Sequence, residues 1–273
     1  MRRALAIGAV CLGAACTSHP DPPVSFVEGL RVLTVRAEPP EVPSGATSQV
    51  TILAVDTEGR AIDVAWSRCL VPPRSGEAVN PACVETPTGT SLQPLGSGMT
   101  IAVQMPAVNP GDLGQPDATN GVYLPVVGRA SAGTDSVTAV YRLRLGGATP
   151  PNMNPAIASV DVVDASGATT PLDEATPLVV HAGDEVTLES TYTPGSAEMY
   201  TAFGGKVLTE TLTTSWFCTA GDLSHERTSA TQPQTVLRLT ERLPAAGKTI
   251  DLWAVVHDER GGVGYTHRAL AFQ

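Results

Sequence analysis

The sequence has few aromatic residues, almost no lysine, and no long apolar run after its first fifteen residues. Aromatic side chains make up 4% of the 273 residues, and Lys206 and Lys248 are the only lysines. A membrane-spanning helix needs about 20 consecutive apolar residues, and no run beyond residue 15 approaches that length. Threonine, valine, glycine and proline are abundant, which favours short strands and many turns. The composition therefore predicts an all-β protein.

Positive charge is also scarce. The formal net charge is −10, and it becomes more negative if Arg2 and Arg3 are removed with an N-terminal signal. A surface of this sign repels the phosphates of nucleic acids and of anionic lipids. We therefore predict no nucleic-acid partner and no electrostatic docking on a membrane.

Sequence motifs of enzymes and metal sites are missing. None of the five histidines has zinc-ligand spacing with another ligand. Ser224, His225 and Glu226 are consecutive, whereas catalytic triads assemble in space, and a Gly-x-Ser-x-Gly elbow is absent. Glycine pairs fall in expected turns and in a linker and do not precede a helix, so no phosphate loop is expected. The sequence predicts no catalytic residues, no transition-metal site and no cofactor.

The N-terminus predicts export. Two arginines precede an apolar stretch, residues 4–15, which has the length of a signal-peptide core. The sequence "LGAAC" then resembles the lipobox of bacterial lipoproteins, with Gly13 where that family prefers leucine. The resemblance implies cleavage after residue 15, lipidation of Cys16 and a lipid anchor in the cell envelope, with Thr17 favouring the outer membrane. Residues 16–28 would form an extended tether. The alternative is an ordinary secretory signal with an incidental cysteine.

Three further cysteines bear on the fold. Export makes disulfides possible, and Cys69 and Cys83 flank a stretch rich in proline and glycine that resembles a loop closed by a bridge. Cys218 is expected to be a buried free thiol, because no catalytic signature surrounds it. A bridge from Cys69 to Cys218 remains open as an alternative.

The chain contains two copies of one pattern. Each copy has a first strand, a small glycine turn and an alternating strand, then a strand that ends in tryptophan and cysteine, "DVAWSRC" with Trp66 and "TTSWFC" with Trp216. About seven short strands per copy, separated by turns, indicate a β-sandwich. The order of features resembles bacterial Ig-like domains of the PKD and cadherin-like kind. We expect two tandem Ig-like β-sandwiches, 29–147 and 156–273, joined by an exposed, semi-stiff linker, 148–155.

Each copy also carries insertions relative to this pattern. They cover about residues 70–98, 109–121 and 193–212. Loops on a rigid sandwich often bind ligands. Long surface insertions cost little stability, however, so we favour the interpretation that they are tolerated loops.

Calcium is a weaker possibility. Asp56, Glu58, Asp258 and Glu259 place carboxylates in expected turns, and carboxylate oxygens are the ligands that Ca²⁺ prefers. The "DxNDN" sequence of cadherins and the EF-hand loop are both absent. Carboxylates in turns ordinarily accept hydrogen bonds from the backbone and face solvent, and we favour that interpretation.

Two features of the last expected hairpin concern its surface. Trp253 should point away from Leu252 and therefore outward, where it is a candidate contact for a protein or a glycan, unless a neighbouring strand or the other sandwich covers it. If the turn centres near Arg260, His267 lies opposite Ala254 and its imidazole faces away from that of His257. A one-residue slip in register would reverse this.

Together these features predict a lipid-anchored envelope protein without catalytic activity. The first hypothesis is a surface module that binds or adheres to an unknown protein or glycan. The alternative is a periplasmic scaffold or an accessory subunit of an envelope complex. A hydrolase is the third class, and it would need a pocket with converging polar groups.

Overall fold

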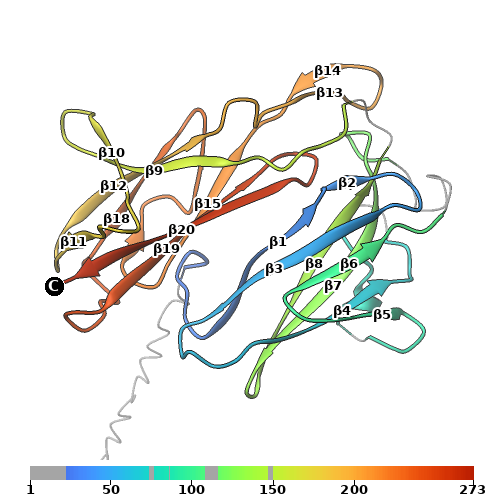
Figure 1. The fold of residues 1–273 in the computed structure, drawn as a ribbon, viewed down its shortest axis with the longest axis horizontal. Helices are drawn as coiled ribbons and strands as arrows, with labels where there is room; N and C mark the ends of the chain where they lie inside the picture. The colour runs from blue at the N-terminus through green and yellow to red at the C-terminus, as the bar shows by residue number, and fades with distance from the viewer. Residues whose placement is uncertain (1–22, 74–76, 86, 108–115, 147–149) are drawn as a thin grey trace, which may run out of the picture.

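A computed structural model describes residues 23–73, 77–85, 87–107, 116–146 and 150–273. Strands dominate this part of the chain and build two sandwiches, each with its own apolar core. Figure 1 shows the first sandwich in blue to green and the second in yellow to red. The prediction of all-β sandwich domains is confirmed.

The first sandwich packs a three-stranded sheet, β1-β3-β6, against a five-stranded sheet, β2-β8-β7-β4-β5. Neighbouring strands are antiparallel, except that the short β2 runs parallel to β8. The elements are β1 (Leu30–Glu38), β2 (Glu41–Val42), β3 (Thr47–Asp56), β4 (Asp63–Cys69), the 3-10 helix η1 (Pro81–Cys83), β5 (Leu92–Ser97), β6 (Thr100–Gln104), β7 (Val122–Ala132) and β8 (Asp135–Leu145).

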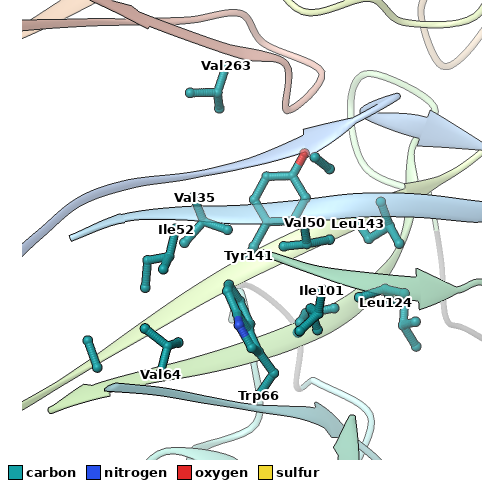
Figure 2. Packing of buried hydrophobic residues seen from close by; sticks show 14 of the residues in the cluster. Val35, Val50, Ile52, Val64, Trp66, Ile101, Leu124, Tyr141, Leu143 and Val263 are labelled. Atoms are coloured by element: carbon teal, nitrogen blue, oxygen red, sulfur yellow. The ribbon is translucent and has the colours of Figure 1, made fainter. Parts of the chain in front are cut away.

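Trp66 on β4 lies at the centre of the first core. Its side chain is fully buried, and its indole Nε1 donates a hydrogen bond to the carbonyl oxygen of Gly98 over 2.8 Å. Gly128 lies opposite on β7, where an added Cβ would come within 2.8 Å of the indole ring. Figure 2 shows Trp66 in the cluster that also contains Val64 and Ile101. Glycine at position 128 therefore provides the space for the large ring.

The second sandwich packs the sheet β10-β9-β12-β18-β16 against the sheet β11-β20-β19-β15-β17. A separate two-stranded hairpin, β13-β14, projects from it. The strands are β9 (Ile157–Val163), β10 (Thr169–Pro171), β11 (Leu178–Val180), β12 (Glu185–Tyr192), β13 (Met199–Thr201), β14 (Val207–Thr209), β15 (Thr213–Cys218), β16 (Asp222–Leu223), β17 (Arg227–Ser229), β18 (Gln234–Arg238), β19 (Thr249–His257) and β20 (Val263–Phe272).

Trp216 on β15 occupies the corresponding place in the second core. It is fully buried, and its indole Nε1 donates to Thr228 Oγ1 over 2.9 Å. Trp66 and Trp216 each lie on the strand that pairs with the first arm of the closing hairpin, β7 or β19. The repeat inferred from the two tryptophans is thus present in three dimensions.

The closing hairpin of the second sandwich differs from the expected register by one residue. His267 pairs with Trp253, whereas Ala254 pairs with Thr266. The turn between the two arms comprises residues 258–262, and within it Asp258 Oδ1 accepts hydrogen bonds from the backbone N–H groups of Arg260 and Gly262. His257 and His267 are therefore on the same face of the sheet, and the expectation that they face apart is wrong.

The cysteines form the expected bridge. Cys69 and Cys83 are joined by a disulfide with a Cα–Cα distance of 5.7 Å, which confirms the predicted pair and excludes the bridge from Cys69 to Cys218. Cys218 is a buried free thiol, as predicted. Burial raises the pKa of its thiol to about 12, so the thiol is protonated at neutral pH.

The last residues of the expected tether, 16–28, are docked on the second sandwich. Phe26 forms a parallel bridge with Cys218, where Val27 N donates to Cys218 O and Cys218 N donates to Ser25 O. The side chain of Val27 is buried. The last residues of the expected tether are therefore bound to the second sandwich, a contact that the sequence did not predict. The predicted signal peptide, 1–15, and Cys16 lie outside the described residues.

The linker is also more ordered than its composition predicts. Asn152 and Pro155 are buried, although Met153 between them is exposed. The linker asparagines hydrogen-bond to both sandwiches, as described below. The prediction of an exposed linker at 148–155 is therefore wrong for residues 152 and 155. Composition alone does not show which polar groups of a linker form hydrogen bonds. No helix within the described residues is long and apolar enough to cross a membrane.

Candidate functional site

The two sandwiches meet through apolar side chains from both. The outer face of the sheet that carries β19 and β20 lies against β1 and β3 of the first sandwich. Val255 and Val263 join the core cluster of the first sandwich, and Figure 2 shows Val263 reaching down toward it. Side chains of the second sandwich therefore extend the hydrophobic core of the first sandwich.

Trp253 lies at the centre of this contact. Its side chain points away from Leu252, as predicted, but it is only 8% exposed because Leu33 and Val27 cover it. Its ring also lies 5.1 Å from that of His267. The prediction of an exposed contact for an external partner is wrong, and the alternative, coverage by the other sandwich, is what the structure shows.

A β-bulge directs Leu33 toward Trp253. The register between β1 and β3 shifts between Val32 and Thr34, which leaves Leu33 as the extra residue. Leu33 is 7% exposed and belongs to the cluster of Trp253 and not to the core of its own sandwich. The bulge thus allows a residue of the edge strand β1 to contact the second sandwich. We call the region where the two sandwiches contact each other the joint.

Two linker asparagines connect the sandwiches by hydrogen bonds. Asn154 Nδ2 donates to the carbonyl oxygen of Ala37 over 2.7 Å, and Asn154 Oδ1 accepts from Val263 N over 2.8 Å. Asn152 N donates to Glu41 Oε2 over 3.0 Å, and its Nδ2 donates to Asp258 Oδ2 over 3.3 Å. Each asparagine therefore bonds to both sandwiches.

A buried arginine anchors the hairpin turn of the second sandwich. The side chain of Arg260 is fully buried, with Nε 2.6 Å from Glu210 Oε1 and Nη2 2.7 Å from Glu198 Oε2. Both glutamates flank the β13-β14 hairpin, so part of the insertion at 193–212 supports the joint and is not merely a tolerated surface loop. Burial raises the pKa of Glu210, although the adjacent guanidinium opposes this.

A second buried arginine lies on the first sandwich. Arg144 Nε is 3.2 Å from Glu41 Oε2, and both side chains are almost fully buried. Arg144 also donates to Thr119 O over 2.9 Å and to the hydroxyl of Tyr123 over 3.0 Å. Because Glu41 also accepts the bond from Asn152, the two buried ion pairs belong to one polar network that crosses the joint.

A cleft of about 540 Å³ opens beside this network. Its volume lies in the range of small-ligand sites. Its lining comes from β1 (Val32 to Val35), β8 (Val137 to Arg142) and the turn between β19 and β20. Valine and alanine side chains contribute apolar surface, and the polar side chains of the lining include Asp117, Tyr123, Arg142, His257, Asp258 and Glu259.

The polar side chains of the cleft are mainly acidic. Arg142 stacks over Tyr123 at 3.9 Å from the ring centroid and lies 3.9 Å from Asp117. Burial opposes ionisation of Asp117, but hydrogen bonds from Thr119, Gly121 N and Tyr123 outweigh it and lower the pKa of Asp117. Its carboxylate is therefore charged at neutral pH.

Burial shifts the pKa values of two further groups in the cleft, His257 and Asp258. Burial, reinforced by repulsion from Arg227, lowers the pKa of His257, so its imidazole is neutral at pH 7. Burial raises the pKa of Asp258, although the N–H groups of Gly262 and Arg260 oppose this. Neither group is paired with a nucleophile, and the cleft lining described here contains no serine or cysteine.

The consecutive Ser224, His225 and Glu226 do not form a triad. Ser224 Oγ lies 3.2 Å from His225 Nδ1, but Glu226 Oε1 accepts hydrogen bonds from the N–H and hydroxyl of Ser25. The carboxylate therefore fixes the N-terminal segment and does not orient the imidazole.

The carboxylates considered for calcium have protein partners. Asp56 Oδ1 accepts from Arg60 Nη2 over 2.7 Å, a bond that lowers the pKa of Asp56, and Glu58 lies 3.3 Å from the same guanidinium. Asp258 caps its own turn, and Glu259 Oε2 accepts from the hydroxyl of Tyr200 over 3.0 Å. No three His, Cys, Asp or Glu side chains of the described residues come together as a metal-ligand set.

Sequence reasoning missed most of this joint. The relevant signals were present in "HDERGG", where Arg260 stands between a strand end and two glycines, and in the linker "NMNP" with its two asparagines. An arginine in a turn is ordinarily exposed, and only the inserted hairpin with Glu198 and Glu210 makes its burial favourable.

Comparisons with known proteins found only distant structural similarity. No protein-family model matches the chain, and no curated protein matches it in sequence. Similar solved structures include three N-terminal domains of the bacteriophage RB49 Highly Immunogenic Outer Capsid protein (Hoc), at 11% identity over 90% of this chain and 70% of that chain, with a TM-score of 0.23. The chicken CNTN1 FN1–FN3 domains match at 10% identity over 90% of this chain and 68% of that chain, with a TM-score of 0.25.

Drosophila N-cadherin EC1–4 is similar at 11% identity over 88% of this chain, with a TM-score of 0.24. This chain covers 49% of the cadherin chain, or about half of its length. These neighbours are β-sandwich domains of the Ig, FN3 and cadherin-like kinds. Values this low carry no argument about ligands or partners.

Proposed function

We propose that this protein is a non-catalytic binding module, held at the cell envelope by a lipid on Cys16. The cleft between the sandwiches carries the proposal, because it combines apolar side chains with mainly acidic polar groups at a junction fixed from both sides. The N-terminal sequence up to "LGAAC" supports the anchor. A ligand would be a protein or a glycan that reaches the cleft from outside.

The joint supports the binding role. Trp253, the linker asparagines and the docked N-terminal segment each connect the two sandwiches. A fixed cleft loses little conformational freedom when a ligand binds, which favours affinity. The alternative role, a periplasmic scaffold or accessory subunit, is favoured by the same rigidity, because a rigid spacer holds its partners at a set distance.

Labelling and protease shaving test the anchor and the location together. The full chain, with a C-terminal epitope, is produced in a bacterial host beside a Cys16→Ser variant, and both are labelled with an alkyne analogue of palmitate. The proposal expects label and membrane retention in the parent only. Equal retention and equal label in both proteins would refute the lipid anchor.

The same cells distinguish the two roles. Loss of the epitope after protease treatment of intact cells places the sandwiches outside and favours the surface binder. Protection until the outer membrane is broken favours the periplasmic scaffold. A screen of the purified chain for hydrolase activity on ester, peptide and glycoside substrates tests the non-catalytic part, and turnover that exceeds a heat-denatured control would contradict it.

A further inference from the structure

The N-terminal segment is attached to the second sandwich at one end of β15. Val27 N donates a hydrogen bond to Cys218 O, and Cys218 N donates to Ser25 O, at the last residue of β15. Glu226 Oε1 also accepts hydrogen bonds from the N–H and the hydroxyl of Ser25. Backbone and side-chain bonds therefore fix the chain at this end of the sandwich.

This attachment lies only a short way along the chain from Cys16. Six residues, 17 to 22, separate Cys16 from Pro23. The seven steps from one Cα to the next span at most about 25 Å. The lipid on Cys16, proposed above, would hold that residue at the membrane surface. The end of the second sandwich near Cys218 would therefore lie within about 25 Å of the bilayer.

The opposite end of β15 leads to the β13-β14 hairpin. Thr213, the first residue of β15, is about 17 Å from Cys218 at the usual rise of a strand, and β14 ends four residues earlier, at Thr209. His257 pairs with Thr213, so the turn that lines the cleft lies at this opposite end too. Figure 1 shows the hairpin at the top of the molecule, well above the start of β1. The anchor would thus hold the hairpin away from the bilayer.

The loop between β18 and β19, residues 239–248, lies beside the attached segment. The guanidinium of Arg242 is 5.0 Å from the centre of the Phe26 ring. Leu243, the next residue of this loop, is 37% exposed, and Val24 in the attached segment is 66% exposed. Two exposed apolar side chains therefore lie at the end of the molecule that the anchor brings to the membrane. Exposed apolar groups at such a place indicate a membrane contact.

The charges of this loop nearly balance. Arg242 forms an ion pair with Asp222, and Glu241 and Lys248 are both exposed. A contact made by this loop therefore has no need of anionic lipid. It is compatible with the net charge of −10, which disfavours electrostatic docking on a membrane.

We propose that the end of the second sandwich formed by Val24 and the loop 239–248 contacts the lipid bilayer, with Val24 and Leu243 among the lipid headgroups. This inference rests on the lipid anchor of the proposed function and names the surface that faces the membrane. Apolar groups of interfacial proteins enter about 5–10 Å into this boundary. The turn that lines the cleft and the β13-β14 hairpin then face away from the bilayer, where a protein or a glycan can reach them.

Fluorescence quenching on vesicles tests this surface. The lipidated protein is purified with Val24→Cys, Leu243→Cys or Phe203→Cys, labelled with a thiol-reactive NBD dye, and reconstituted in phosphatidylcholine vesicles that contain nitroxide-labelled lipid. Phe203, in the turn of the β13-β14 hairpin, is 66% exposed, as Val24 is, and provides the matched control. The parent serves as the blank, because its disulfide and the burial of Cys218 protect its thiols from the dye. We expect loss of fluorescence at positions 24 and 243 and none at position 203.

Hydrogen exchange on the unlabelled parent provides a second readout, because a dye can itself enter a bilayer. Relative to the Cys16→Ser protein mixed with the same vesicles, the parent should show slower exchange in residues 239–248 and unchanged exchange in residues 202–206. Equal exchange in residues 239–248, or protection of residues 202–206 instead, would overturn the proposed surface.

Flotation of the vesicles distinguishes failure of the surface from failure of the anchor. Parent protein that does not float with the vesicles would refute the anchor and this inference together. Protein that floats, but whose label is quenched equally at all three positions, only at position 203 or at none of them, would refute the membrane surface and leave the anchor in place.

Discussion

The hydroxyl of Tyr141 donates a hydrogen bond to the carbonyl oxygen of Gly261 over 2.9 Å. Tyr141 belongs to the core of the first sandwich, and Gly261 lies in the turn that closes the second. Figure 2 shows the ring in the core with its hydroxyl directed toward the side where Val263 lies. Burial raises the pKa of Tyr141, so the phenol remains protonated and can donate at any physiological pH.

Replacement of this phenol should weaken the joint by a modest amount. Tyr141→Phe keeps the ring in the core and leaves the Gly261 carbonyl without its donor. We expect the free energy of unfolding to fall by about 1 kcal/mol, measured by urea denaturation. Tyr123→Phe removes a hydroxyl from the polar network of the first sandwich and serves as a comparison. No loss in Tyr141→Phe would show that the bond does not contribute.

Arg260 should be the most sensitive charged residue. Arg260→Met leaves Glu210 and Glu198 buried without their cation, so we expect a loss of roughly 3–5 kcal/mol in the free energy of unfolding. The double variant Arg260→Met with Glu210→Gln removes one uncompensated charge and should recover part of that loss. A surface pair offers the control: Arg238→Met breaks the exposed contact with Glu185 and should cost less than about 1 kcal/mol.

Reduction of the disulfide should destabilise the first sandwich. Cys69 and Cys83 are 14 residues apart, and a loop of this size contributes about 3 kcal/mol in the chain-entropy model. The Cys69→Ser, Cys83→Ser double variant is expected to lose a comparable amount, measured by denaturant unfolding. The reductant should then have no additional effect on that variant. An unchanged denaturation midpoint in the parent after complete reduction would contradict this expectation.

Acidification should reveal the buried imidazole of His257. Because its pKa is lowered in the folded state, the unfolded chain takes up the proton first as the pH falls below about 6.5, and the folded state loses stability. Asp258 has a raised pKa and contributes in the opposite direction, so the comparison is made with His257→Gln. Between pH 7 and pH 5 the parent should lose more stability than this variant. Parallel pH profiles would contradict the assignment.

Local sequence patterns predicted the sandwiches well. Trp66 and Trp216 stand on equivalent strands with alternating apolar neighbours, and this pattern requires only that one face of each strand is buried. Cys69 and Cys83 flank one loop, so their pairing followed from proximity along the chain. These features depend on contacts within a single copy of the repeat.

The joint could not be predicted in the same way, because its contacts link distant parts of the chain. Trp253 was expected to be exposed, since alternation gives its direction but not what covers it. The linker asparagines have partners in both sandwiches, and several of these partners lie more than 100 residues away along the chain. The register of His267 depends on where the turn capped by Asp258 is centred, which a glycine-rich sequence does not specify.

Calorimetry of the purified protein tests the central claim, that the joint makes the two sandwiches one cooperative unit with a fixed cleft. The account predicts a single unfolding transition in the parent, with equal calorimetric and van't Hoff enthalpies. It also predicts that Trp253→Ala, which removes the large side chain between the sandwiches, separates this transition into two, whereas Trp253→Phe does so less. Two independent transitions in the parent would contradict the account.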